Sequence, residues 1–246
     1  MITTFEDYSQ NPITLPADET EDLINEYLLS ATPKICCLES YWGKGMTDVF
    51  SIKPFVKSIG WLLEKDIVCV HRMISSGSDL AHYVKYPEGI IWQDPNLAGI
   101  DCFYLASHGK PGGLLTSVKD SESDELIDAF NGLHRYNTIV YFGACEVFAG
   151  EIGIQFANRF LRETGAVAVV GYANQTSFLD GLMIDTLFLS RFFELTGNRF
   201  EQLQEVYDGA VTDYPRAKAC GFCIFLNDKY PQSSRQSQIT PSTIPF

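Results

Sequence analysis

The chain has 246 residues, of which 46% are hydrophobic and 13% aromatic, so it suits one large α/β domain or two small ones with a substantial core. The formal net charge of −13 excludes the Lys- and Arg-rich surface through which proteins bind nucleic acids or anionic membranes. The seven cysteines are odd in number and irregularly spaced, which indicates reduced thiols in a cytoplasmic protein rather than a disulfide framework.

The chain divides by composition into three segments. Residues 1–33 are an acidic extension, in which residues 18–29 have the periodicity of one short helix. Residues 34–228 form the expected domain, and residues 229–246 are a Ser-, Gln- and Pro-rich tail that we expect to be mobile. The first seven residues lack the basic and apolar segments of a signal peptide, and no apolar run is long enough to span a bilayer.

Short apolar runs alternate with amphipathic segments along the domain. The runs predict strands over residues 34–39, 67–71, 100–107, 138–142, 166–171 and 221–226. The amphipathic segments predict helices over residues 54–65, 78–85, 124–133, 152–164, 182–194 and 200–211, and a small hairpin is expected over residues 114–118. This alternation predicts an α/β fold with a mostly parallel six-stranded sheet flanked by helices, whose functional site lies at the carboxyl ends of the strands.

Two of the predicted strands end at reactive side chains. The strand over residues 100–107 leads into His108, and the strand over residues 138–142 leads towards Cys145. If the two strands are parallel neighbours, the imidazole can face the thiol and take its proton, and the thiolate then serves as a nucleophile. Within the predicted strands before residue 108, the cysteines are interpreted as core residues: Cys36, Cys37, Cys69 and Cys102.

These strand ends carry a resemblance to a known family. A strand that ends in Ser-His-Gly (residues 107–109), followed by one that ends in Ala-Cys (residues 144–145), resembles the caspase-like cysteine peptidases, most closely the small bacterial CHAT-domain proteases. Residues 37–42 and 164–172 support the resemblance, which covers residues 34–226. It implies a three-layer caspase-like (caspase-hemoglobinase) fold and a cysteine endopeptidase that needs no cofactor and no metal.

The resemblance also implies roles for individual residues. His108 is the general base and acid, Cys145 is the nucleophile, and the backbone N–H groups of Gly109 and Cys145 form the oxyanion hole. Such enzymes cleave partner proteins at chosen sites, in cell death or in bacterial antiphage defence, and some bacterial relatives activate gasdermin-like pore formers. The sequence leaves open whether a separate partner activates the enzyme.

The chain departs from the caspases around the cysteine. Caspases have Gln two residues before the nucleophile and Arg-Gly after it, where this chain has Gly143 and the pair Glu146-Val147. Specificity for aspartate is therefore not expected, and cleavage after a basic or a small apolar residue fits the sequence better.

Further residues near the predicted strand ends are candidates for contacting substrate. Glu39 can orient His108, contact a cationic substrate residue, or pair with a nearby lysine. Asp180 can read the residue before the cut, or it can be a loop or helix-capping carboxylate. Trp42 and Tyr172 can form a wall of the pocket, or they can pack at the edge of the sheet. The substrate-binding candidates are Glu39, Trp42, Gly143, Tyr172 and Asp180.

Two alternatives to a peptidase stay open. The first is a catalytically silent member of the same fold that acts as a protein-interaction module. The second is a redox or metal protein built on the CxxC motif of Cys220 and Cys223, although no second CxxC or histidine cluster completes a zinc site. Glycine-rich nucleotide-binding motifs and the GxSxG motif of serine hydrolases are absent from the sequence.

Overall fold

The computed structural model describes residues 32–41, 51–94, 97, 99–135, 137–195 and 199–229. The expected helix over residues 18–29, the candidate Trp42 and the expected tail beyond Lys229 lie outside the described residues. Within the part of the chain that is described, no helix is both long enough and apolar enough to cross a membrane.

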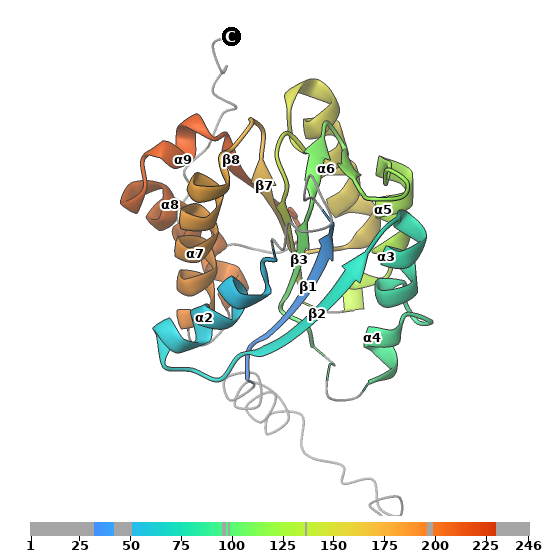
Figure 1. The fold of residues 1–246 in the computed structure, drawn as a ribbon, viewed down its shortest axis with the longest axis horizontal. Helices are drawn as coiled ribbons and strands as arrows, with labels where there is room; N and C mark the ends of the chain where they lie inside the picture. The colour runs from blue at the N-terminus through green and yellow to red at the C-terminus, as the bar shows by residue number, and fades with distance from the viewer. Residues whose placement is uncertain are drawn as a thin grey trace, which may run out of the picture.

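A six-stranded sheet in the order β2-β1-β3-β6-β7-β8 forms the centre of the fold (Figure 1). Neighbouring strands are parallel, except that β8 runs antiparallel to β7. The predicted six-stranded, mostly parallel sheet is therefore confirmed. The strands are β1 (Lys34–Ser40), β2 (Val68–Ile74), β3 (Cys102–Ala106), β6 (Ile139–Gly143), β7 (Ala168–Tyr172) and β8 (Phe222–Leu226).

Helices cover both faces of the sheet (Figure 1). Buried side chains of α2, α7, α8 and α9 pack on one face, and those of α3, α4, α5 and α6 pack on the other. The helices are α2 (Lys53–Leu63), α3 (Gly77–Val84), α4 (Ile90–Gln93), α5 (Ser123–Ala129), α6 (Gly150–Thr164), α7 (Phe178–Glu194), α8 (Leu203–Asp213) and α9 (Arg216–Ala219), with 3-10 turns at Leu133–Arg135 and Arg199–Gln202.

The hairpin after β3 differs from the prediction over residues 114–118. Its strands are β4 (His108–Lys110) and β5 (Gly113–Leu115), which pair antiparallel. The turn between them contains Gly112, whose φ of +70° lies in the left-handed region that glycine adopts without strain. His108 is therefore the first residue of β4.

Helix α7 begins earlier than the predicted start at residue 182. The Ser177 side chain accepts a hydrogen bond from the Asp180 N–H (3.1 Å), which is the contact of a helix N-cap. The cap lets α7 start at Phe178. This extra turn brings α7 up to the carboxyl ends of the strands, where the candidate residues lie.

Candidate functional site

His108 and Cys145 lie at the carboxyl ends of neighbouring parallel strands. Ala106 of β3 is opposite Gly143 of β6, and each candidate follows its strand by two residues. Both residues line one pocket of about 300 Å³. The structure therefore brings the predicted base and the predicted nucleophile to one small site.

Gly109 places the two segments in backbone contact. A Cβ added at Gly109 would come within 2.0 Å of the Cys145 carbonyl oxygen and 2.9 Å of Val147 Cγ2. The Gly112 N–H also donates to the Val147 carbonyl (2.8 Å), so the hairpin contacts the segment after Cys145 at two points. The amides predicted to form the oxyanion hole, those of Gly109 and Cys145, thus belong to two segments in direct contact.

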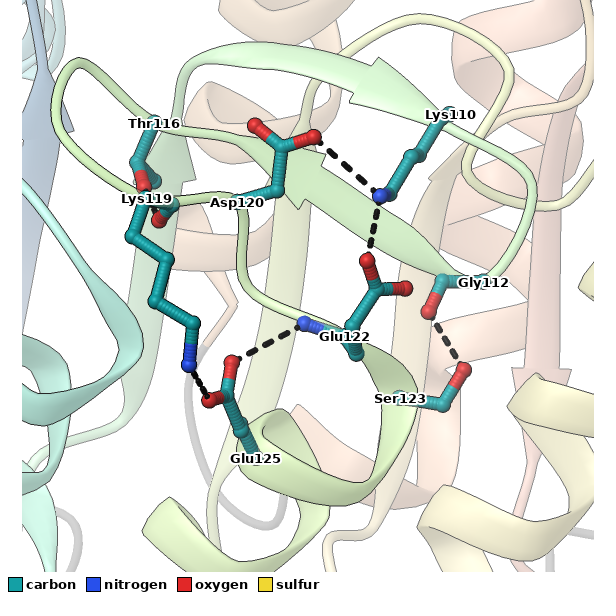
Figure 2. A network of polar contacts seen from close by, with 8 residues as sticks. All are labelled: Lys110, Gly112, Thr116, Lys119, Asp120, Glu122, Ser123 and Glu125. Carbon is teal, nitrogen blue, oxygen red and sulfur yellow. Dashed lines mark hydrogen bonds and ion pairs between the residues drawn. The ribbon is translucent and has the colours of Figure 1, made fainter.

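Figure 2 shows how the β4–β5 hairpin is tied to the start of α5. Lys110 Nζ lies 2.6 Å from Glu122 Oε1 and 3.3 Å from Asp120 Oδ2. The Ser123 hydroxyl donates to the Gly112 carbonyl in the hairpin turn (2.5 Å). Exposed ion pairs contribute only about 0–1 kcal/mol each, so the main effect of this network is to fix where the hairpin lies.

The sulfur of Cys145 contacts the segment that precedes α7. The Thr176 N–H donates to Sγ (3.3 Å), and Sγ lies 3.4 Å from the Thr176 carbonyl oxygen, which can accept the thiol proton. The next residue, Glu146, has a φ of +61°, a conformation that costs a non-glycine residue about 1–2 kcal/mol. A half-buried sulfur with an N–H donor and a strained neighbour favours a functional thiol over a core thiol.

A buried carboxylate forms the floor of the pocket. Asp185 in α7 is 4% exposed and accepts hydrogen bonds from the hydroxyl groups of Tyr104, Tyr141 and Tyr172, which lie on β3, β6 and β7. The bond from Tyr104 Oη to Asp185 Oδ2 measures 2.5 Å. Burial raises the pKa of Asp185 to about 6, although the three hydroxyl donors act in the opposite direction.

Asp185, Tyr104 and Tyr141 are not among the site residues predicted from the sequence. Two signals in the sequence point to them. Asp185 interrupts a strongly apolar helix, and a carboxylate in such a place is almost never buried without partners. Tyr104 and Tyr141 precede His108 and Cys145 by the same four residues, so they occupy equivalent places in neighbouring strands.

Gly143 and Tyr172, two of the predicted substrate-binding residues, line the pocket. A Cβ at Gly143 would lie 2.3 Å from Tyr104 Oη, so the absence of a side chain there makes room for the hydroxyl. Tyr172 reaches the pocket from β7 and bonds Asp185 at its floor.

Glu39 is fully buried near the end of β1. Its carboxylate lies 2.6 Å from His71 Nε2 and accepts hydrogen bonds from the Ser51 hydroxyl (2.8 Å) and the Ile52 N–H (3.0 Å). Because Ile52 lines the pocket, these contacts fix one of its walls. The proposed roles of Glu39 in orienting His108 and in contacting substrate stay predictions.

Asp180 lies in the first turn of α7 and is not among the described residues that line the pocket. Its carboxylate accepts hydrogen bonds from the hydroxyl groups of Ser177 (2.6 Å) and Tyr214 (2.7 Å) and pairs with Arg216 (3.0 Å). The hydrogen bonds from Ser177 and Tyr214 hold its pKa below the usual value. These contacts match the helix-capping alternative, and its role in reading the substrate stays a prediction.

The CxxC cysteines lack the electrostatics of a redox motif. Burial raises the pKa of Cys223 to about 12 and also raises the pKa of Cys220. Redox-active cysteines need a lowered pKa, because the thiolate is the reacting form. Among the described residues, no group of three or more His, Cys, Asp or Glu side chains is arranged to hold a metal ion.

No protein-family model matches the sequence, and no curated protein matches it significantly. The resemblance to the caspase-like peptidases is therefore carried by residues 107–109 and 144–145 at the two strand ends and by residues 37–42 and 164–172.

Proposed function

We propose that the protein is a cysteine endopeptidase of the caspase-like type, with Cys145 as the nucleophile and His108 as its general base. The observation that carries this proposal is the shared pocket, which is lined by His108 after the end of β3 and by Cys145 after the end of β6. The α/β fold with a mostly parallel sheet is compatible with the three-layer caspase-like fold that the resemblance implies.

The residues support a two-step acyl transfer. His108 takes the proton of the Cys145 thiol, and the thiolate attacks the scissile carbonyl carbon. The C–S bond forms as the carbonyl π electrons move to the oxygen, which an N–H group such as that of Gly109 stabilises. The C–N bond then breaks, and the amine leaves with the proton from His108. Water, deprotonated by His108, hydrolyses the thioester and restores the thiol.

The other strand cysteines are poor alternatives as the nucleophile. Burial raises the pKa of Cys36, Cys37, Cys69 and Cys102, so each of these thiols stays protonated at neutral pH. None of them lines the pocket.

The surface beside the pocket suits a protein or peptide substrate. Phe178 lines the pocket and is 51% exposed, and Leu179 and Met183 are exposed on the same end of α7. An apolar rim of this kind suits the side chains that flank a bound segment. The placement of the activity in bacterial defence or cell death, with a gasdermin-like pore former as a substrate, rests on the sequence resemblance alone.

The first test measures thiol reactivity and needs no knowledge of the substrate. Alkylation of each cysteine by iodoacetamide is followed from pH 5 to pH 9 by peptide mass spectrometry. We expect Cys145 to react well below the pH near 8.5 at which reference thiols titrate, and His108→Ala to abolish this advantage. His134→Ala, which changes an exposed histidine outside the pocket, is the matched control.

Two outcomes separate the alternatives. If Cys145 reacts no faster than the buried cysteines, the peptidase proposal fails and the silent interaction module is favoured. Once a substrate is found, its cleavage should vanish in Cys145→Ala and survive in Cys220→Ala, whereas a redox protein predicts the reverse.

A further inference from the structure

We propose that Asp185 and its three tyrosines make the pocket a recognition site for a cationic side chain, a lysine or an arginine, of the bound protein segment. The inference rests on the proposed peptidase function in so far as it names the residue that the enzyme selects. The binding of a cation to the pocket can nevertheless be measured without any catalysis.

The floor of the pocket offers hydrogen-bond acceptors and no spare donors. Each tyrosine hydroxyl has one proton, and Tyr104, Tyr141 and Tyr172 each direct it to Asp185. Tyr104 and Tyr172 line the pocket, and their phenolic oxygens keep lone pairs; Tyr141 is fully buried behind them. A carboxylate has about four acceptor sites, of which three are used. A donor-rich group such as a guanidinium or an ammonium is the natural complement of this floor.

The charge of Asp185 has no cationic partner in the described structure. The residues that line the pocket include no lysine or arginine, and no ion pair to Asp185 occurs in the described part of the chain. The groups that face its carboxylate are the three tyrosine hydroxyls from the sheet, which are neutral because burial holds their pKa values high. A buried carboxylate without a counter-ion is costly, so a cation that enters the pocket gains a large electrostatic stabilisation.

The shape of the pocket also suits one long side chain with a charged end. Its walls are apolar, from Ile52, Ala144 and Leu182, and a volume of about 300 Å³ lies at the small end of the range for ligand pockets. Tyr104 and Tyr172 line it as well, and aromatic rings attract cations. The apolar walls accommodate the methylene stem of a lysine or arginine while the charge reaches the floor.

The Tyr104 hydroxyl connects the strand that leads to the thiol with the floor of the pocket. Tyr104 Oη packs against Gly143, two residues before Cys145, and donates to Asp185 across 2.5 Å. A residue whose carbonyl is attacked by Cys145 can therefore extend its side chain past Gly143 to the carboxylate. An aspartate or glutamate in the same place would bring a second carboxylate against Asp185, and an apolar residue would leave Asp185 without a counter-ion.

The test compares two carboxylates on the same helix. Peptidyl chloromethyl ketones of one backbone, ending in arginine, citrulline, norleucine or aspartate, are reacted with the full-length wild type, Asp185→Asn and Asp180→Asn, and alkylation of Cys145 is followed by mass spectrometry. Citrulline has the shape of arginine without its charge. We expect the arginine probe to react about tenfold or more faster than the citrulline probe in the wild type and in Asp180→Asn. In Asp185→Asn this ratio should fall to about one.

The outcomes distinguish the recognition proposal from the peptidase proposal. If Cys145 reacts with the norleucine or aspartate probe as fast as with the arginine probe, the recognition proposal is overturned and the peptidase proposal stands. The same holds if Asp180→Asn, not Asp185→Asn, removes the preference. If no probe alkylates Cys145 in any variant, the peptidase proposal is the one in difficulty.

A second measurement tests the recognition proposal if no probe alkylates Cys145, or if Asp185→Asn does not fold. The melting temperature of the wild type and of Cys145→Ala is recorded with benzamidine and with benzamide, which differ by the cationic charge. We expect benzamidine to raise the melting temperature of both proteins and benzamide to leave it unchanged. Equal shifts with the two compounds, or no shift with benzamidine, overturn the recognition proposal.

Discussion

The carbonyl oxygen of Cys145 occupies the space that a side chain on Gly109 would need, 2.0 Å from where a Cβ would lie. This contact couples the hairpin that begins at His108 to the segment that carries the thiol. The position of the His108 backbone relative to the Cys145 segment is therefore set by backbone packing, in addition to the register of β3 and β6.

Gly109→Ala should disturb this contact. Overpacked sites cost roughly 1–3 kcal/mol, so we expect the free energy of unfolding to fall by about that amount and the selective alkylation of Cys145 to be lost. In Gly181→Ala the new Cβ meets only Thr176 Cγ2 at 3.7 Å and Tyr172 Oη at 3.9 Å, and alanine is favoured over glycine in a helix by roughly 0.5–1 kcal/mol. Urea unfolding measures the free energy of unfolding of both variants. If Gly109→Ala is as stable as the wild type, the steric argument is wrong.

The pKa of Asp185 should be visible in the pH dependence of stability. Burial raises this pKa from 3.8 to about 6, so the folded protein binds the proton more tightly than the unfolded chain does. The contribution of Asp185 to stability is therefore fully present below about pH 4 and is lost as the pH rises through about 6, by at most about 3 kcal/mol. Asp185→Asn should remove this pH-dependent part of the free energy of unfolding, which is measured by urea unfolding at several pH values between pH 4 and pH 7.

Asp180→Asn is the control for that experiment, and its effect should have the opposite sign. Hydrogen bonds from Ser177 and Tyr214 lower the pKa of Asp180, so its contribution is present above the unfolded pKa and is lost as the pH falls. If both variants change the pH profile in the same direction, the assignment of the two carboxylates is wrong.

Removal of one tyrosine hydroxyl should weaken the floor of the pocket. Hydrogen bonds to charged groups contribute about 1.5–3 kcal/mol, and we expect Tyr104→Phe or Tyr141→Phe to lower the free energy of unfolding by about that amount. The same changes should raise the pKa of Asp185 further, because these donors hold it down. Tyr207→Phe removes a hydroxyl that donates to the Phe222 carbonyl (3.0 Å), and it should leave the titration of Asp185 unchanged.

The cap of α7 should affect both stability and thiol reactivity. Loss of a serine N-cap costs about 1 kcal/mol, so Ser177→Ala should destabilise the protein by that amount. It should also slow alkylation of Cys145, because the neighbouring Thr176 N–H contacts the sulfur. Ser76→Ala removes the equivalent cap of α3. It should lower the free energy of unfolding by about the same amount without changing the alkylation rate of Cys145. Equal thiol reactivity in the two variants would show that the cap does not position Thr176.

The sheet and the two reactive strand ends could be predicted because their signals are local. Strands that are apolar at every position, such as β3 and β6, are typical of a buried parallel sheet. The side chains that follow such strands collect at one edge, which is why His108 and Cys145 could be placed together. The four-residue helices α4 and α9 were missed, because so short a segment shows no periodicity.

The other features of the site depend on contacts between segments that are distant in sequence. The hairpin starts at His108 because the hairpin backbone packs on the Cys145 segment. No sequence pattern within residues 108–118 predicts this contact. The proximity of Glu39 to His71 depends on the pairing of β1 with β2. The convergence of three strands on Asp185 depends on which helix covers which face of the sheet.

The bonds of Asp185 also determine which parts of the molecule can fluctuate independently. Helix α7 cannot separate from β3, β6 and β7 without exposing a carboxylate and breaking three hydrogen bonds, so the floor of the pocket belongs to the most cooperative unit of the fold. The rim at Thr176 and Ser177 is held by loop contacts and a helix cap, which can open locally. Amide exchange should therefore be fast at the rim and slow at the floor, and access to the site can vary while the groups at its base stay in place.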